Sequence, residues 1–241
     1  MPNTYFQFKQ FTVYQDRCAM KVCTDACVQG AFTARYLADK GLGAGGRLLD
    51  IGAGTGLLSL LLAQQVAADI TAVELDAAAY EQASANFAAA PWADRMVVNH
   101  GDIRDWEGGT PFDFIITNPP FYEADLKSQD QLRNQAMHAT TLSYEQLLAA
   151  IDRLLAADGA FSILLPYRYF STFQQLAAAS DLHLTTALHV SQRTGKAYFR
   201  SIGIFSRQRQ EADIRTMDIY QEASSYTPAF ITLLKDYYLY L

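Results

Sequence analysis

The chain has 241 residues, half of them hydrophobic and 18% charged, and its formal net charge is −6. This length suits one α/β domain with short appendages, and the apolar fraction argues against long disordered stretches. The acidic balance argues against nucleic-acid binding over the whole surface, because proteins that bind mainly phosphates usually carry a positive excess. No apolar run reaches the roughly 20 residues of a membrane-spanning helix, and the first residues lack signal-peptide features, so we expect a cytoplasmic protein without membrane contact.

Residues 1–45 are expected to form a segment ahead of the main sheet. Apolar and polar residues alternate over 5–13, which hints at extended structure. The alanine-rich stretch 25–39 predicts a helix whose cap is Thr24 or Asp25.

The three cysteines are crowded into one short part of this segment, at Cys18, Cys23 and Cys27. Their spacing fits neither a zinc hairpin nor a disulfide framework. We therefore expect free thiols and no metal site.

Short β-type runs alternate with helical patterns over residues 46–206, the expected catalytic core. The predicted strands are 47–51, 69–73, 96–99, 112–117 and 160–165. The predicted helices are 57–65, 77–89, 143–156 and 171–179. Strands and helices that alternate in this way indicate a mostly parallel sheet with helices on both faces.

The core is expected to end in a β-hairpin. The β-type runs 183–190 and 197–205 are separated by a short glycine-containing link, which favours an antiparallel hairpin at the sheet edge. Together these elements predict an α/β, Rossmann-like fold of the methyltransferase type, with a mostly parallel seven-stranded sheet. Residues 207–241 add a possible strand at 214–219 and a helix at 227–238, and we expect the whole chain to form a single domain.

Residues 50–56 read DIGAGTG and stand between a predicted strand and a leucine-rich helix. Gly52, Gly54 and Gly56 allow a sharp turn and let a ligand approach the main chain where a Cβ would collide. Asp50 would repel a pyrophosphate but suits the sulfonium and α-amino groups of S-adenosylmethionine. We therefore interpret the loop as the binding site of that cofactor. The alternative is a glycine-rich turn without a ligand.

Two further acids follow at the ends of the next predicted strands. Glu74 stands where an acid accepts the ribose hydroxyls of an adenosine cofactor, with Asp76 as the alternative. Asp102 and Ile103 end the third strand, in a position suited to the adenine amino group. The carboxyl ends of parallel strands meet at one edge, where open α/β sheets bind ligands, so these acids support one another.

The fourth predicted strand leads into Asn118-Pro119-Pro120-Phe121. The two prolines forbid a helix and hold their carbonyls outward. The Asn118 side chain, also expected to touch the cofactor, and the Pro119 carbonyl can each accept a hydrogen from one exocyclic amino group. That arrangement would turn the nitrogen lone pair toward the methyl group without a strong base. Phe121, with Tyr122, offers a flat face for the substrate ring. The alternative is a proline-stiffened strand exit without chemistry.

This motif alone leaves the acceptor open between adenine N6, a protein glutamine and guanine N2. Almost end to end, however, the chain resembles the bacterial family that methylates N6 of the adenine beside the anticodon of a valine tRNA. The segments that carry this resemblance are FKQF at 8–11, DRCAMKV at 16–22, DIGAGTG, VELD at 73–76, PWADR at 91–95, NPPF and DYYL at 236–239. The short stretch before DIGAGTG disfavours the release-factor glutamine enzymes, which resemble this core but carry a larger helical domain there.

The resemblance implies a tRNA substrate and a first segment that closes over the cofactor. It places Lys21, Thr24 and Asp25 near the amino-acid end of S-adenosylmethionine. We expect the enzyme to be a monomer. A non-catalytic cofactor-binding subunit is the remaining alternative, although such a subunit would have no reason to keep both acceptors of the NPPF motif.

Basic residues gather in two parts of this acidic chain, and together they could form a positive rim that grips RNA. The first group lies at the start, at Lys9, Arg17 and Lys21. The second lies on the predicted hairpin and its exit, at Arg193, Lys196, Arg200, Arg207 and Arg209. We take Arg193, Lys196 and Arg200 as candidate substrate-binding residues. The alternative is ordinary solvated charges that protect an edge strand from aggregation.

Overall fold

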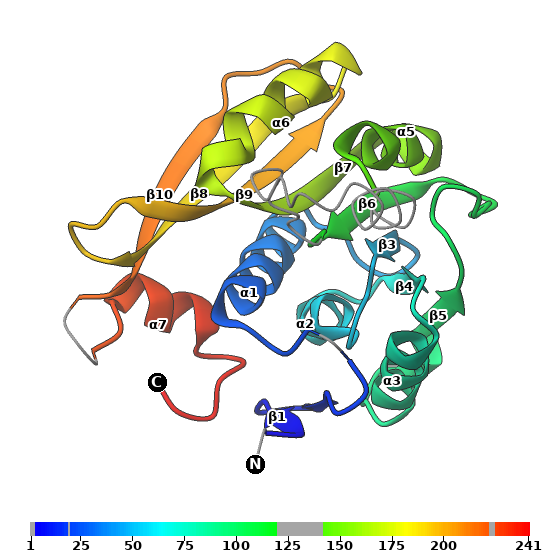
Figure 1. Cartoon of the computed structure of the whole chain (residues 1–241), viewed down its shortest axis with the longest axis horizontal. Helices are drawn as coiled ribbons and strands as arrows, with labels where there is room; N and C mark the ends of the chain where they lie inside the picture. Colours follow the sequence, from blue (N-terminus) through cyan, green and yellow to red (C-terminus); the bar gives the residue numbers. More distant parts are fainter. Residues whose placement is uncertain (1–2, 19, 120–141, 222–224) are drawn as a thin grey trace, which may run out of the picture.

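The computed structural model describes residues 3–18, 20–119, 142–221 and 225–241. Within them, the main sheet has the strand order β10 (Asp213–Tyr220), β8 (His183–Arg193), β9 (Tyr198–Ser206), β7 (Leu155–Pro166), β6 (Phe112–Thr117), β3 (Arg47–Ile51), β4 (Asp69–Glu74) and β5 (Met96–His100) (Figure 1). β9 runs antiparallel to both of its neighbours, and the other neighbouring strands are parallel. The predicted mostly parallel, Rossmann-like α/β sheet is thus confirmed.

Helices cover both faces of the sheet (Figure 1). One face packs against α1 (Thr24–Asp39), α2 (Leu57–Gln65), α3 (Ala77–Ala88) and α7 (Pro228–Leu234), and the other against α5 (Tyr144–Leu154) and α6 (Tyr167–Ala179). A separate apolar cluster is buried on each side. Because both faces are covered, the central strands are almost continuously apolar, and β7 is buried at every position from Gly159 to Pro166.

The edge of the sheet differs from the expected one. The hairpin of β8 and β9 forms as predicted, but β10 pairs in parallel with β8 and becomes the outermost strand, an eighth one. Met217 and Ile219 of β10 are buried, and Phe230 and Leu234 of α7 join the same cluster. The apolar side chains of β10 and α7 are buried by packing against the main sheet. The sheet therefore continues past the β8–β9 hairpin and ends at β10. The predicted helix at 227–238 is also shorter, ending at Leu234.

The N-terminal residues form a two-stranded antiparallel sheet of β1 (Tyr5–Gln7) and β2 (Thr12–Tyr14), followed by α1. The N-cap of α1 is Cys23 rather than Thr24 or Asp25, and the Cys23 side chain makes no capping hydrogen bond. The buried Asn86 of α3 ties this segment to the glycine loop. Its amide nitrogen donates to the carbonyls of Tyr14 at 2.9 Å and Thr55 at 2.8 Å.

The carboxyl ends of the parallel strands, the β8–β9 turn and the start of α1 lie along one side of the sheet, called the carboxyl edge below. None of the described helices is long and apolar enough to cross a membrane.

Candidate active site at the carboxyl edge

The glycine loop has a backbone that only glycine adopts readily. Gly52, Gly54 and Gly56 have φ angles of 74°, 55° and 80°, in the left-handed region. A Cβ added at Gly52 or Gly54 would meet no atom within 4 Å, so the main chain borders open space there. A Cβ at Gly56 would lie 2.5 Å from the Phe87 ring. Gly52 and Gly54 thus leave room for a ligand, whereas Gly56 permits helix packing.

Glu74 holds this loop in shape from the end of β4. Its Oε2 accepts a hydrogen bond from the Gly54 amide at 2.8 Å, and its Oε1 accepts one from the Asp76 amide at 2.8 Å. Each carboxylate oxygen can accept a second hydrogen bond. The half-buried Glu74 can therefore bind a diol while it supports the loop. Leu75, which is 50% exposed, follows it and offers an apolar surface that was missed in the sequence.

Asp50 lies beneath the loop and is only 1% exposed. Its Oδ2 accepts hydrogen bonds from the Ser59 hydroxyl at 2.7 Å and the Ser59 amide at 3.2 Å. Its Oδ1 is buried without a hydrogen-bond partner among the described residues. Burial raises the pKa of Asp50 to about 6, against the lowering effect of Ser59. Asp50 is thus a desolvated acceptor at the loop that a nearby cationic group would satisfy.

Asp102 forms an ion pair with Arg104, a residue that was not identified from the sequence. Its Oδ2 is 2.5 Å from Arg104 Nη2, and its Oδ1 accepts the Arg104 amide at 2.9 Å. The Arg104 guanidinium lowers the pKa of Asp102, which keeps the carboxylate ionised as an acceptor. Ile103 is buried in the cluster beneath α5. The Gly101 amide donates to the Glu74 carbonyl at 2.9 Å, which places these residues beside the end of β4.

Asn118 leaves β6 next to the glycine loop. The Thr117 hydroxyl donates to the Ile51 carbonyl at 3.0 Å, so the exits of β6 and β3 are joined. The Asn118 Oδ1 is buried and has no hydrogen-bond partner in the described part of the chain. Pro119 is buried beside it. Pro120, Phe121 and Tyr122 lie outside the described residues.

Gln29 of α1, which was missed in the sequence, supports the exit of β6 from below. This side chain is fully buried, and its Nε2 donates to the Thr117 carbonyl at 2.9 Å. The contact fixes the peptide unit that joins Thr117 to Asn118.

Gln29 belongs to a polar stripe on α1, made of Asp25, Gln29, Thr33 and Tyr36. Asp25 Oδ2 accepts from Arg200 Nε of β9 at 2.7 Å, and Thr33 donates to Ser162 of β7 at 2.9 Å. Tyr36 follows one turn later, and its ring centroid lies 6.1 Å from that of Phe114 in β6. Polar residues at helical spacing within an otherwise apolar helix were the sequence signal for this stripe.

Lys21 lies just before α1, and Thr24 lies at its start. Lys21 is exposed, and its ammonium donates to the Asn3 carbonyl at 3.4 Å. Thr24 is partly buried and is the first residue of α1. Asp25 lies in the first turn of α1, one turn before Gln29, and so reaches the carboxyl edge.

The cysteines are poorly suited to react as thiolates. Burial raises the pKa of Cys18 to about 11 and those of Cys23 and Cys27 to about 12. Nearby acids, including Glu74 at Cys18 and Asp25 at Cys23, add to the effect.

The basic residues do not form the single hairpin group that was expected from the sequence. Arg193, Lys196 and Arg200 flank the β8–β9 turn at the carboxyl edge. β9 then carries the chain away, so Arg207 and Arg209 lie at the opposite edge. They pair there with Asp152 at 2.8 Å and Asp181 at 3.2 Å, respectively. The strand direction explains this correction, because residues at the two ends of a strand face opposite sheet edges.

The N-terminal basic residues are likewise engaged locally. Lys9 donates to the Lys235 carbonyl, and Arg17 pairs with Glu81 at 3.4 Å.

Comparison with known proteins adds to this geometry. Residues 31–163 match the model of the methyltransferase small domain family. A tRNA1(Val) (adenine(37)-N6)-methyltransferase of Dyadobacter fermentans is 43% identical over 242 residues, covering 98% of each chain. A protein of the same name from Phocaeicola vulgatus is 40% identical over 99% of each chain. A solved structure of a predicted O-methyltransferase from Agrobacterium tumefaciens shares the fold, with a TM-score of 0.65, 16% identity, and coverage of 88% of this chain and 96% of that one.

Proposed function

Because this chain belongs to the methyltransferase small domain family, and within it to the bacterial tRNA1(Val) adenine-N6 methyltransferases, we propose that it methylates N6 of adenine 37 in that tRNA. The methyl donor is S-adenosylmethionine, which supplies an electrophilic methyl group when bound. The observation that carries the proposal is the buried Asn118 Oδ1 beside the open glycine loop. Among the described residues, this oxygen has no hydrogen-bond partner.

The carboxyl edge fits this cofactor. Gly52 and Gly54 leave open space at the main chain, and the Oδ1 of Asp50, which no described residue hydrogen-bonds, suits the cationic amino-acid end. Glu74 would accept the ribose hydroxyls, and Asp102 the adenine amino group. We assign Lys21, Thr24 and Asp25 only to the surroundings of the cofactor's amino-acid end.

Asn118 and Pro119 would orient the acceptor. Their side-chain and main-chain oxygens would each accept one hydrogen of the adenine amino group, which directs the nitrogen lone pair at the methyl carbon. The bound cofactor would supply the methyl group, and the two acceptors would stabilise the positive charge that grows on the adenine nitrogen as it accepts that group. Water removes one proton after transfer, so no protein base is required. Phe121 and Tyr122 are proposed to stack on the adenine.

The test is incubation with labelled S-adenosylmethionine and an extract that contains tRNA, rRNA and protein from a strain that lacks this enzyme. We expect label in N6-methyladenosine of the valine tRNA. Label only in protein glutamine or in guanine of rRNA would overturn the proposal in favour of the other acceptors that share the NPPF motif. No label in any acceptor would favour a non-catalytic subunit.

We further propose that the chain folds as a single domain and acts as a cytoplasmic monomer. Sedimentation of the purified protein, with and without tRNA, tests the oligomeric state.

A further inference from the structure

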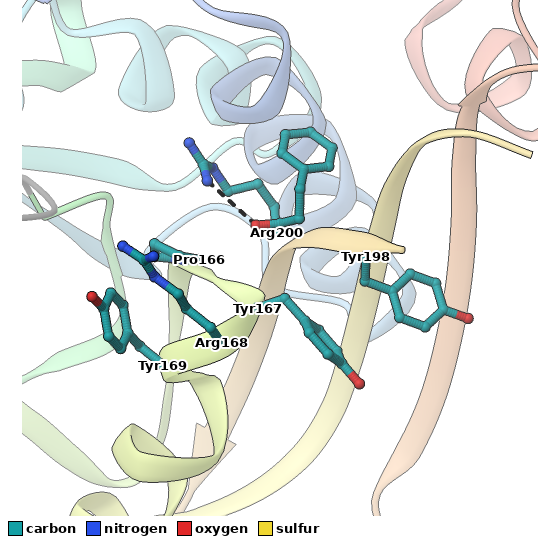
Figure 2. Close-up of a pocket in the computed structure, with 7 residues that line it drawn as sticks. Pro166, Tyr167, Arg168, Tyr169, Tyr198 and Arg200 are labelled. Atoms are coloured by element: carbon teal, nitrogen blue, oxygen red, sulfur yellow. Dashed lines mark hydrogen bonds between the residues drawn. The ribbon is translucent and has the colours of Figure 1, made fainter. Parts of the chain in front are cut away.

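A hollow opens at the carboxyl edge beside the proposed reaction site (Figure 2). Its walls are residues 166–169, where β7 passes into α6, and residues 198–200 at the start of β9, and its volume is about 440 Å³. Pro166 and Arg200 are paired across the two strands, so the walls are held by the sheet itself.

One side of the hollow is aromatic. The Tyr167 and Tyr198 rings lie 5.3 Å apart between centroids and are 43% and 36% exposed. His189 packs edge-on against Tyr167 at 5.1 Å, and its Nδ1 is 2.9 Å from the Ser201 hydroxyl. Burial lowers the pKa of His189, so the ring backing the two tyrosines is uncharged at neutral pH. Paired, partly exposed rings on a firm support form a stacking surface for a planar ligand.

The other side is basic. Figure 2 shows the guanidinium groups of Arg168 and Arg200 on one side of the hollow and the rings of Tyr167 and Tyr198 on the other. Arg168 lies 4.6 Å over the Tyr169 ring, and Arg200 is held by Asp25. The N-cap of α6 is Pro166, whose side chain makes no capping hydrogen bond, and the amide groups of the first turn add positive potential. Guanidinium groups suit phosphate oxygens in particular.

The hollow adjoins Asn118. Thr117 of β6 is paired with Ile163 of β7, so Pro166 lies two residues further along the sheet than Asn118 and one strand away. With the usual rise per residue and strand spacing, this separation is roughly 8 Å. A ligand in the hollow would therefore be a near neighbour of the group that Asn118 orients.

We propose that the hollow binds the nucleotide next to the target adenosine, with its base on Tyr167 and Tyr198 and its phosphate at Arg168 and Arg200. The inference rests on the proposed function and names part of its substrate site. An enzyme that modifies a base must take it out of the stack, which leaves the adjoining base without its stacking partner. Aromatic rings replace that stacking, and arginines hold the backbone in place.

The experiment uses the full-length protein and the anticodon stem-loop of the valine tRNA. For Tyr167→Ala/Tyr198→Ala, KM for the RNA should rise about 10-fold or more, because each stacked base contributes substantially to affinity. The matched Tyr167→Phe/Tyr198→Phe variant keeps both rings and should resemble the wild type. Arg168→Ala should weaken binding and reduce the slope of log affinity against log salt by about 0.7. Arg209→Ala, at the opposite edge, and Tyr240→Ala, whose ring is 88% exposed, are the controls.

A second readout does not depend on turnover. A 2-aminopurine on either side of the target adenine should change its fluorescence on binding wild-type protein, and the alanine double variant should abolish this change. Wild-type protein that fails to methylate the RNA would overturn the proposed function itself. If the wild-type protein is active but the alanine double variant has the same KM and the same fluorescence change, only the inference is overturned. The inference is also overturned if the double variant loses as much affinity for the cofactor as for the RNA.

Discussion

Arg200 Nε donates a hydrogen bond to Asp25 Oδ2 at 2.7 Å, which joins β9 to the first turn of α1. From the sequence, Asp25 was expected at the cofactor and Arg200 at the RNA, whereas the structure places the two side chains in one ion pair. Both are largely shielded from solvent, with side-chain exposures of 13% and 28%. A change at either residue should therefore affect both ligands.

A double-mutant cycle of Arg200→Gln and Asp25→Asn tests this link. Each single change should weaken S-adenosylmethionine binding and raise KM for tRNA, because each removes the charge–charge attraction between Arg200 and Asp25. A hydrogen bond between charged groups contributes about 1.5–3 kcal/mol, so the double variant should lose clearly less than the sum of the single losses. Strict additivity, measured by calorimetry and steady-state kinetics, would show that the pair does not couple the two sites.

Asp50 predicts two opposite responses to pH. Its pKa is raised from 3.8 to about 6 in the folded protein, so the folded state holds a proton that the unfolded state loses between these values. The free energy of unfolding should consequently fall as pH rises from about 4 to about 6, by up to about 3 kcal/mol. Cofactor affinity should change the other way, weakening below pH 6 as the carboxylate is protonated.

The Asp50→Asn variant is the control, because it cannot ionise but can still accept from Ser59. Denaturant unfolding and cofactor titration at pH 5 to 8 should show both pH dependences reduced in this variant. An identical pH dependence in wild type and variant would mean that another group titrates.

Asn118→Ala should remove turnover while most of the cofactor affinity remains. The side chain contributes one of the two proposed acceptors for the amino group, and loss of one such group typically lowers kcat by about 10²- to 10³-fold. Single-turnover kinetics with saturating cofactor measures this effect. A rise in KM with kcat unchanged would instead indicate that Asn118 only binds the substrate.

Gly54→Ala and Gly56→Ala should fail for different reasons. Both place alanine in the left-handed region, at a cost of roughly 1 kcal/mol. At Gly54 the methyl group enters the open space of the proposed cofactor site, so the main loss should be in cofactor affinity. At Gly56 it would overlap the Phe87 ring, which typically costs a further 1–3 kcal/mol or so. Thermal unfolding and cofactor titration of each variant distinguish a loss of stability from a loss of cofactor affinity. If the two variants lose stability and cofactor affinity to the same extent, the prediction is wrong.

The sequence predicted those parts of the fold that depend on local patterns. Strands 47–51 and 112–117 and the helix at 57–65 have the predicted bounds, because apolar runs with clear glycine or polar limits define them. The glycine loop and Glu74 come together as expected, because the strand-end positions of a parallel sheet are fixed by its connectivity.

The remaining features depend on contacts between distant segments. The sequence around Asp102 does not indicate that the Arg104 side chain turns back to bind it. The hydrogen bond from Gln29 to Thr117 joins residues that are 88 positions apart in the sequence. Arg200 and Arg207 lie at opposite edges of the sheet because β9 runs from one edge to the other. That direction was predictable, but its consequence for the surface was overlooked.

The polar stripe of α1 bears on how the enzyme brings two large ligands together. A helix held by apolar contacts alone can roll or slide slightly at small cost, since such contacts are not directional. Any such shift of α1 would break its hydrogen bonds to β6, β7 and β9 at the same time, and polar groups that lose their partners in a protein interior are costly. The distance between the methyl donor and the RNA surface is therefore set when the chain folds, before either ligand arrives, and neither ligand's binding free energy is needed to establish it.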